Sequence, residues 1–222
     1  MRQFSVELDE LHEKVLQMGG YVESAIHRSV RALVDREPEL ARQVMRDEAR
    51  INQMEIEVDN LTTRMFALRQ PMAKDLRFLT AAMKINTDLE RMGDLAVNIA
   101  QRAISLVNQP QVKPLIDIPR MAQLVESMLL RCLDAFVKGD ADEATSVLTA
   151  DDEVDSLRDS VYQELVAYMQ SEPTTVPAAI DLMFVARNLE RIADHATNIA
   201  EDVVFLVKGV DVRHHAIEVR DA

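Results

Sequence analysis

Apolar residues recur every three or four positions along most of the chain, which is the spacing of one face of an α-helix. The first such stripe runs through Leu8, Leu11 and Val15 to about residue 35. A second covers about 38–68 and opens with Pro38, at a position where a first-turn proline is tolerated. A third runs from about 71 to 107. The first half of the sequence therefore predicts three long helices.

The second half predicts three more helices, over about 119–139, 141–170 and 177–208. Gly209 is a natural stop for the last of them. A polar stretch with two prolines, residues 109–116, reads as a linker between the halves. The closing residues 209–222 are weakly patterned and are expected to form a frayed tail. His214 and His215 lie in this tail; the alternative interpretation is that they bind a metal.

The two halves repeat one another. Leu89, Glu90, Arg91, Asp94, Ala96, Asn98, Ile99 and Ala100 recur as Leu189, Glu190, Arg191, Asp194, Ala196, Asn198, Ile199 and Ala200. Eight matches in twelve positions exceed the roughly one expected from average composition. The sequence thus predicts an all-α protein with a first three-helix repeat over 1–108, the linker 109–116, a second repeat over 117–208, and the tail.

Composition agrees with this picture and narrows the function. Only 5 Gly and 7 Pro occur in 222 residues, which suits a few long helices better than a sheet with many turns. The net charge is −13 and no basic stripe is present, so nucleic acid is excluded as a partner. Cys132 is the single cysteine and is expected to be a buried apolar side chain. Early acids argue against a signal peptide and no apolar run reaches membrane-spanning length, so we expect a cytoplasmic protein.

Paired acids are the candidate chemistry. Glu90 and Asp94 are four residues apart, as are Glu190 and Asp194, so each pair shares one helix face with Cβ atoms roughly 6 Å apart. Carboxylate oxygens at that spacing can share a hard or borderline divalent cation, but a second helix must complete the site. The spacing points to Asp151 and Asp155 for the second repeat, and to Glu48, with Asn52 beside it, for the first.

The alternative interpretation of these acids is a solvated helix face. Arg91 and Arg191 lie three residues before Asp94 and Asp194, so local ion pairs account for the pattern equally well. Catalytic signatures are otherwise scarce. The acidic segments lack the Glu-x-x-His motif of di-iron bundles, and no nucleophile with its base is apparent. The doublet Asp194-His195 is typical of metal phosphohydrolases, but its counterpart in the first repeat is Asp94-Leu95.

At these residues the chain resembles the PhoU family. The resemblance rests on Leu89-Glu90-Arg91-Met92-Gly93-Asp94 and Leu189-Glu190-Arg191-Ile192-Ala193-Asp194-His195, each followed by Asn-Ile-Ala, and extends to Asp75-Leu76-Arg77 and Leu16-Gln17-Met18-Gly19. It covers about residues 4–208. It implies two tandem three-helix bundles built from six long antiparallel helices, commonly assembled as a homodimer.

The resemblance also implies a function. Members of this family are cytoplasmic negative regulators, not enzymes, that link the Pst phosphate ABC transporter, through its ATPase subunit, to the sensor histidine kinase of the phosphate regulon. Some members bind iron or zinc clusters through paired acidic motifs. Carried over, the ligands of such a cluster, or of another divalent cation, would be Glu90, Asp94, Glu190, Asp194, Asp151, Asp155 and, where Asn52 replaces a second acid, Glu48. Two alternatives stand beside this reading: a metal-dependent phosphohydrolase and a purely structural helical adaptor.

Overall fold

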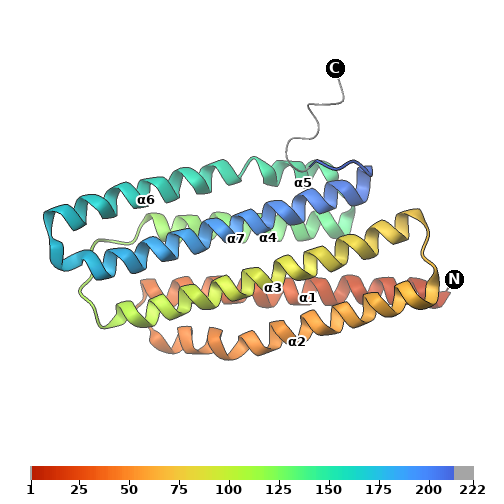
Figure 1. Cartoon of the computed structure of the whole chain (residues 1–222), viewed down its shortest axis with the longest axis horizontal. Helices are drawn as coiled ribbons and strands as arrows, with labels where there is room; N and C mark the ends of the chain where they lie inside the picture. Colours follow the sequence, from red (N-terminus) through yellow and green to blue (C-terminus); the bar gives the residue numbers. More distant parts are fainter. Residues whose placement is uncertain (1, 213–222) are drawn as a thin grey trace, which may run out of the picture.

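The computed structural model describes residues 2–212 and consists of two helical layers of matching design (Figure 1). The first repeat contains three helices, and the second contains their counterparts, one of them in two pieces. The elements are α1 (Arg2–Val34), α2 (Pro38–Arg69), α3 (Ala73–Val107), α4 (Asp117–Lys138), α5 (Ala141–Leu148), α6 (Asp151–Ser171), the 3₁₀ turn η1 (Pro173–Thr175) and α7 (Val176–Lys208). No strand occurs within these residues, so the expected all-α fold of two tandem three-helix bundles is confirmed.

Local chemistry sets the helix ends where the sequence indicated. Pro38 opens the first turn of α2, where its missing N–H is harmless. Gly139 and Gly209 end α4 and α7 with φ of 65° and 68°, the left-handed conformation that glycine adopts without a Cβ penalty. Asp140 starts α5 by accepting hydrogen bonds from the N–H groups of Asp142 and Glu143.

The sequence-based prediction of one helix in the second repeat is wrong. The segment expected to be continuous over 141–170 is divided into α5 and α6 at Thr149 and Ala150, whereas its counterpart α2 is unbroken. The Thr149 hydroxyl donates to the carbonyl of Ser146, and the Ala150 N–H donates to the carbonyl of Val147. These bonds close the last turn of α5. The break gives α6 a fresh N-terminus at Asp151, where the helix dipole favours acidic side chains.

The two repeats pack on each other through α3 against α7 and α1 against α4 (Figure 1). Each of the three histidines within residues 2–212 contacts the other repeat at this junction. The ring centroid of His12 lies 5.2 Å from that of Phe136, His27 pairs with Glu126 at 3.3 Å, and His195 lies against Asp88. Cys132 is fully buried in α4, and burial raises the pKa of its thiol to about 12, as expected for a structural cysteine. His214 and His215 lie outside the described residues.

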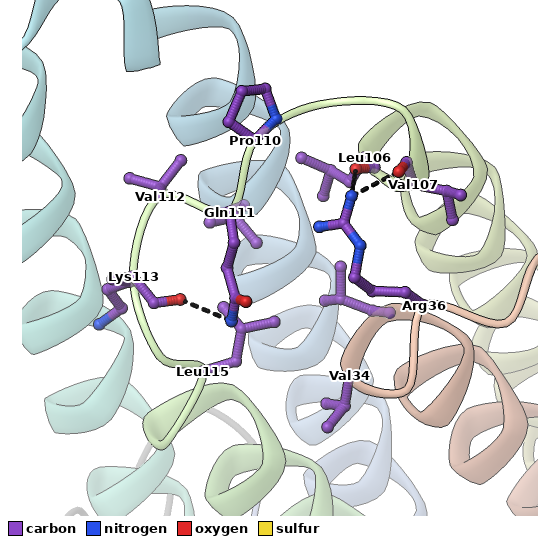
Figure 2. A pocket seen from close by; sticks show the side chains of 11 residues that line it. Val34, Arg36, Leu106, Val107, Pro110, Gln111, Val112, Lys113 and Leu115 are labelled. Atoms are coloured by element: carbon purple, nitrogen blue, oxygen red, sulfur yellow. Dashed lines mark hydrogen bonds between the residues drawn. The ribbon is translucent and has the colours of Figure 1, made fainter.

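The segment that joins α3 to α4 is held to the first repeat by Arg36 and to the second repeat by its own Lys113 (Figure 2). A guanidinium nitrogen of Arg36 donates to the backbone carbonyls of Leu106, Val107 and Gln109 at the end of α3. Lys113 is almost completely buried and pairs with Glu164 of α6. The connection is therefore part of the packed structure. None of the helices in the described part of the chain combines the length and apolarity needed to cross a bilayer.

Candidate functional site

The spatial register of α2 and α6 decides which acids face Glu90 and Glu190. Ile51, Met54 and Val58 are buried on α2, and the same spacing recurs on α6. The matching buried residues of α6 are Val154, Leu157 and Val161. This register pairs Glu48 with Asp151, Asn52 with Asp155, Glu55 with Arg158, and Asp59 with Tyr162.

A first carboxylate cluster forms between α2 and α3, and it consists of Glu55, Asp59, Glu90 and Asp94. Burial raises the pKa of Glu90, and the neighbouring Asp94 and Glu55 raise it further, while Arg91 lowers it. Burial likewise raises the pKa of Glu55, with Asp59 as the next contributor. Arg91 approaches Glu90 and Asp94 only at 3.4 and 3.5 Å, and 58% of its side chain is exposed. The cluster is thus weakly neutralised.

Asn86 lies one turn before Glu90 on α3 and carries an unusual polar atom. Its side chain is fully buried, and its Nδ2 donates to the carbonyl of Glu55 and to Oδ1 of Asp59, both at 3.0 Å. Its Oδ1 has no hydrogen-bond partner among the described residues. An unsatisfied buried oxygen costs about 1–3 kcal/mol. The first cluster therefore contains a spare buried oxygen beside its carboxylates.

The second cluster, Asp151, Asp155, Glu190 and Asp194, lies between α6 and α7. Burial raises the pKa of Asp151 to about 6, with Asp194 and Asp155 as the largest charged contributors. Burial also raises the pKa of Asp194, and Asp155 adds to that shift. The structure thus brings together all four acids that the sequence assigned to this repeat.

The second cluster contains a cation of its own. Arg158 places Nη1 at 2.6 Å from Oε1 of Glu190 and at 3.0 Å from Oδ1 of Asp155. Only 23% of its side chain is exposed. Arg158 stands at the position that Glu55 occupies in the first repeat, and Ala186 stands where Asn86 does. Glu90 and Asp94 of the first cluster correspond to Glu190 and Asp194 of the second, but the α2 and α6 members of the two clusters stand at different positions of the repeat.

Sequence reasoning missed Glu55 and Asp59, although their four-residue spacing is the signal used for the other pairs. Glu48 lies two helical turns before Glu55 on α2, further from Asn86 and Asp59. Its role as a ligand stays a prediction. The missed pair could have been found by requiring that the acids of α2 lie opposite Glu90 in an antiparallel register.

The donor chemistry of the first cluster fits a hard or borderline divalent cation. It offers four carboxylates and a buried amide oxygen without a partner among the described residues, and the pKa values of Glu55 and Glu90 are raised first by burial and then by neighbouring carboxylates. Within residues 2–212, no three His, Cys, Asp or Glu side chains already converge as a metal requires. The side chains would therefore have to rotate toward a common ion. The second cluster fits less well, because Arg158 already binds two of its acids.

Comparisons with known proteins place these features in a family. The sequence matches the PhoU domain twice, over residues 15–103 and 118–203. A relative from Pseudomonas aeruginosa, named "Phosphate-specific transport system accessory protein PhoU homolog", is 41% identical over 214 residues, covering 96% of this chain and 88% of the relative.

Two crystal structures share the fold. PhoU from Pseudomonas aeruginosa superposes with a TM-score of 0.90 at 39% identity, covering 93% of this chain and 100% of that one. The phosphate transport system regulatory protein PhoU from Streptococcus pneumoniae gives a TM-score of 0.88 at 30% identity, covering 94% and 99%.

Fold and site together define an all-helical tandem-repeat protein with an acidic cluster in each repeat. The two domain matches fall on the two repeats, and the similarity runs over nearly the whole chain. The chain belongs to the PhoU family.

Proposed function

We propose that this chain is an accessory regulator of phosphate uptake. In this proposal it restrains the Pst transporter and the phosphate-starvation response when phosphate is plentiful, by contacting the transporter's ATPase subunit and the sensor histidine kinase. Support comes from the relatives, which are named as an accessory protein of the phosphate-specific transport system and as a phosphate transport regulatory protein.

The observation that carries the proposal is the packed junction between the repeats. Long helices α3 and α7 lie against each other along the centre of the molecule (Figure 1). Each repeat also leaves large apolar side chains exposed on its outer helices, among them Ile56 on α2 and Val166 on α6. Such residues are suited to protein contacts. A partner bound to one repeat is thereby held in a defined relation to a partner bound to the other.

We propose in addition that a divalent cation, such as iron, zinc or a harder ion, binds at the first cluster. Glu55, Asp59, Glu90 and Asp94 would hold it, with the Asn86 amide oxygen as a further donor. When bound, the cation would supply the positive charge that these crowded carboxylates lack. Glu190, Asp194, Asp151 and Asp155 form the second candidate set, in which Arg158 competes with the ion.

A hydrolytic role has less support. His195, the histidine of the Asp194-His195 doublet, directs its Nδ1 to Asp88 at 2.7 Å and so joins the repeats. Its burial and this bond favour a structural role for it.

The proposed function is tested by complementation. The chain is expressed in a Pseudomonas aeruginosa strain that lacks its own PhoU, and a phosphate-starvation reporter is measured at high phosphate. We expect reporter expression to fall to the wild-type level. The purified chain should also retain the transporter's ATPase subunit and the kinase in pull-down assays. Unrestrained reporter expression in spite of normal protein levels would contradict the proposal.

A further inference from the structure

A groove of about 620 Å³ opens at the end of the molecule where α1 and α3 begin and α4 and α7 end. It is distinct from both carboxylate clusters, and helices of both repeats line it. Its apolar walls are formed by Leu8, Phe78, Phe136, Val137, Leu206 and Val207. A segment of chain that lay in this groove would therefore contact both repeats at once.

The opposite end of the molecule shows how such a surface is covered. The repeat counterparts of four of these wall residues lie there, and they are Leu33, Val34, Leu106 and Val107. The non-helical segment 110–115, which follows α3, crosses them and leaves a cavity of only about 30 Å³ (Figure 2). Val112 and Leu115 of that segment pack against the core. Val107 is partly buried at this covered end, whereas 40% of its counterpart Val207 is exposed.

The chain that follows α7 continues the pattern of the chain that follows α3. The repeat spacing that relates α3 to α7 also relates Val112-Lys113 to Val212-Arg213. Val212 packs against the core, as Val112 does. Gly209 ends α7 beside the groove, since a Cβ there would lie 3.9 Å from Cζ of Arg77, which lines it. The chain therefore leaves α7 at the rim of the groove.

Both central helices also end against an arginine. Arg36 donates to carbonyls at the end of α3, and Nε of Arg77 donates to the carbonyl of Leu206 near the end of α7 at 3.3 Å. A guanidinium at this position offsets the negative end of the helix dipole. The covering segment 110–115 and the chain after α7 thus start from the same kind of anchor.

The charges around the groove favour an occupant with little net charge. The basic side chains there are Lys74, Arg77 and Lys138, and the acidic ones are Asp9, Asp75 and Asp134, the last paired with Lys138 at 2.7 Å. The segment 213–222 has two arginines and two acids, and Ile217 and Val219 are its largest aliphatic residues. Its charges balance as those of the groove do.

We propose that the chain's own segment 213–222 lies in this groove and closes this end of the molecule, as segment 110–115 closes the other. An extended chain spans roughly 3.5 Å per residue, so Ile217 reaches up to about 17 Å from Val212. Ile217 and Val219 are two residues apart, so they point to the same side of an extended segment and enter the apolar walls together. The segment then holds α7 against α1, α3 and α4, and this inference does not depend on the proposed function.

Disulfide trapping in the full chain tests the contact. The variant Val137→Cys/Ile217→Cys places one thiol on the groove wall and one on the segment, and it is oxidised mildly. We expect an intramolecular disulfide, detected by peptide mass mapping. The matched control is Asp142→Cys/Ile217→Cys, because Asp142 lies outside the groove, is 94% exposed and pairs with Lys208 at the end of α7. The control thiol is thus within reach of the segment, and we expect it to form several-fold less disulfide.

Thermal unfolding provides a second measurement. The variant Ile217→Asp/Val219→Asp places charges on the side chains that enter the groove, and its unfolding midpoint should fall by about 2–4 °C. Glu218→Gln/Arg220→Gln changes the alternate positions of the same segment and should move the midpoint less.

Three outcomes would overturn the inference. The first is an equal disulfide yield from the Val137 and Asp142 pairs, which would mean that the segment samples both surfaces without a preferred site. The second is a disulfide between two chains in place of one within a chain, which would make a second copy the source of the occupant. The third is an unchanged unfolding midpoint in Ile217→Asp/Val219→Asp.

Discussion

Nδ1 of His195 on α7 lies 2.7 Å from Oδ1 of Asp88 on α3, and this contact ties the second repeat to the first. Both side chains are largely buried, with 19% and 15% exposure. Asn198, one turn from His195, also approaches Asp88, at 3.4 Å. The pair is one of several polar contacts between α3 and α7, which also include Lys84 with Asp202 at 2.7 Å and Arg102 with Asp181 at 3.2 Å.

We expect His195→Ala to lower the free energy of unfolding by about 1–3 kcal/mol, because Asp88 is left buried without its main partner. Urea denaturation measures the effect. His27→Ala is the matched control, since it removes a second histidine–carboxylate contact between the repeats whose histidine is 56% exposed. Its cost should be under about 1 kcal/mol. Equal costs for the two variants would show that burial of the Asp88 contact adds nothing.

The second cluster predicts a dependence of stability on pH. Burial and neighbouring acids raise the pKa of Asp151 from 3.8 to about 6. The folded state therefore holds this proton more tightly than the unfolded state, and the free energy of unfolding falls as pH rises from 3.8 through about 6. Asp194 acts in the same direction. Because Asp151 is only half-buried, we expect about 1 kcal/mol.

The measurement is thermal unfolding from pH 4 to pH 7.5 with a chelator present. Asp151→Asn should flatten the decline and raise stability near neutral pH. Asp152→Asn, on the adjacent residue in the same helical turn, is the control; because Asp152 raises the pKa of Asp151 less than burial, Asp194 or Asp155 does, most of the decline should remain. A decline of the same size in Asp151→Asn would assign it to other groups.

The charge at Arg158 predicts that the two clusters differ as cation sites. We expect Glu55→Gln/Glu90→Gln to weaken binding of a divalent cation about tenfold or more. The double substitution removes two carboxylates from the cluster that has no arginine at the position of Arg158. Glu190→Gln/Asp194→Asn should have a smaller effect. Isothermal titration with zinc or ferrous iron, together with metal content by mass spectrometry, measures both. Equal losses from the two pairs would contradict the assignment, and so would a protein that binds no metal at all.

Arg158→Leu extends this test. Removing the guanidinium leaves Asp155 and Glu190 without their 3.0 and 2.6 Å partner. We expect the variant to be less stable without metal and to gain cation affinity at the second cluster. The gain in affinity is measured as the increase in stability that added zinc gives Arg158→Leu, compared with the increase that it gives the unchanged chain.

Two adjacent glycines on α1 predict opposite effects of alanine. A Cβ at Gly19 would lie 2.3 Å from Cδ1 of Leu133 on α4, whereas a Cβ at Gly20 meets nothing within 4 Å. Gly20→Ala should stabilise the protein by about 0.5–1 kcal/mol, since alanine favours the helix. Gly19→Ala should be less stable than Gly20→Ala by about 1–3 kcal/mol because the repeats must move apart. Indistinguishable unfolding midpoints for Gly19→Ala and Gly20→Ala would mean that the Leu133 side chain moves aside without a cost in stability.

The helical faces were predictable because their apolar period is long and regular. The break at Thr149 and Ala150 was not, because neither residue is a strong helix breaker and the apolar spacing continues across it. The second cluster was found from the four-residue spacing of its acids. Glu55 was missed because its counterpart, Arg158, carries the opposite charge, and a search for repeated acids passes over a position where the repeats have diverged. Asn86 gave no signal, since only burial reveals its spare oxygen.

The hydrogen bonds from Arg36 to the end of α3 determine how this chain tolerates changes in length. A junction between duplicated units is ordinarily the place where insertions accumulate and where units are exchanged between proteins. Here the junction covers apolar residues of both halves and binds a side chain from the α1–α2 turn. An added residue between 109 and 116 would displace Lys113 from Glu164, so the cost would resemble that of a core substitution. We therefore expect the two units to tolerate little change in the length of the segment that joins them, and to be difficult to separate or exchange at this point without loss of stability.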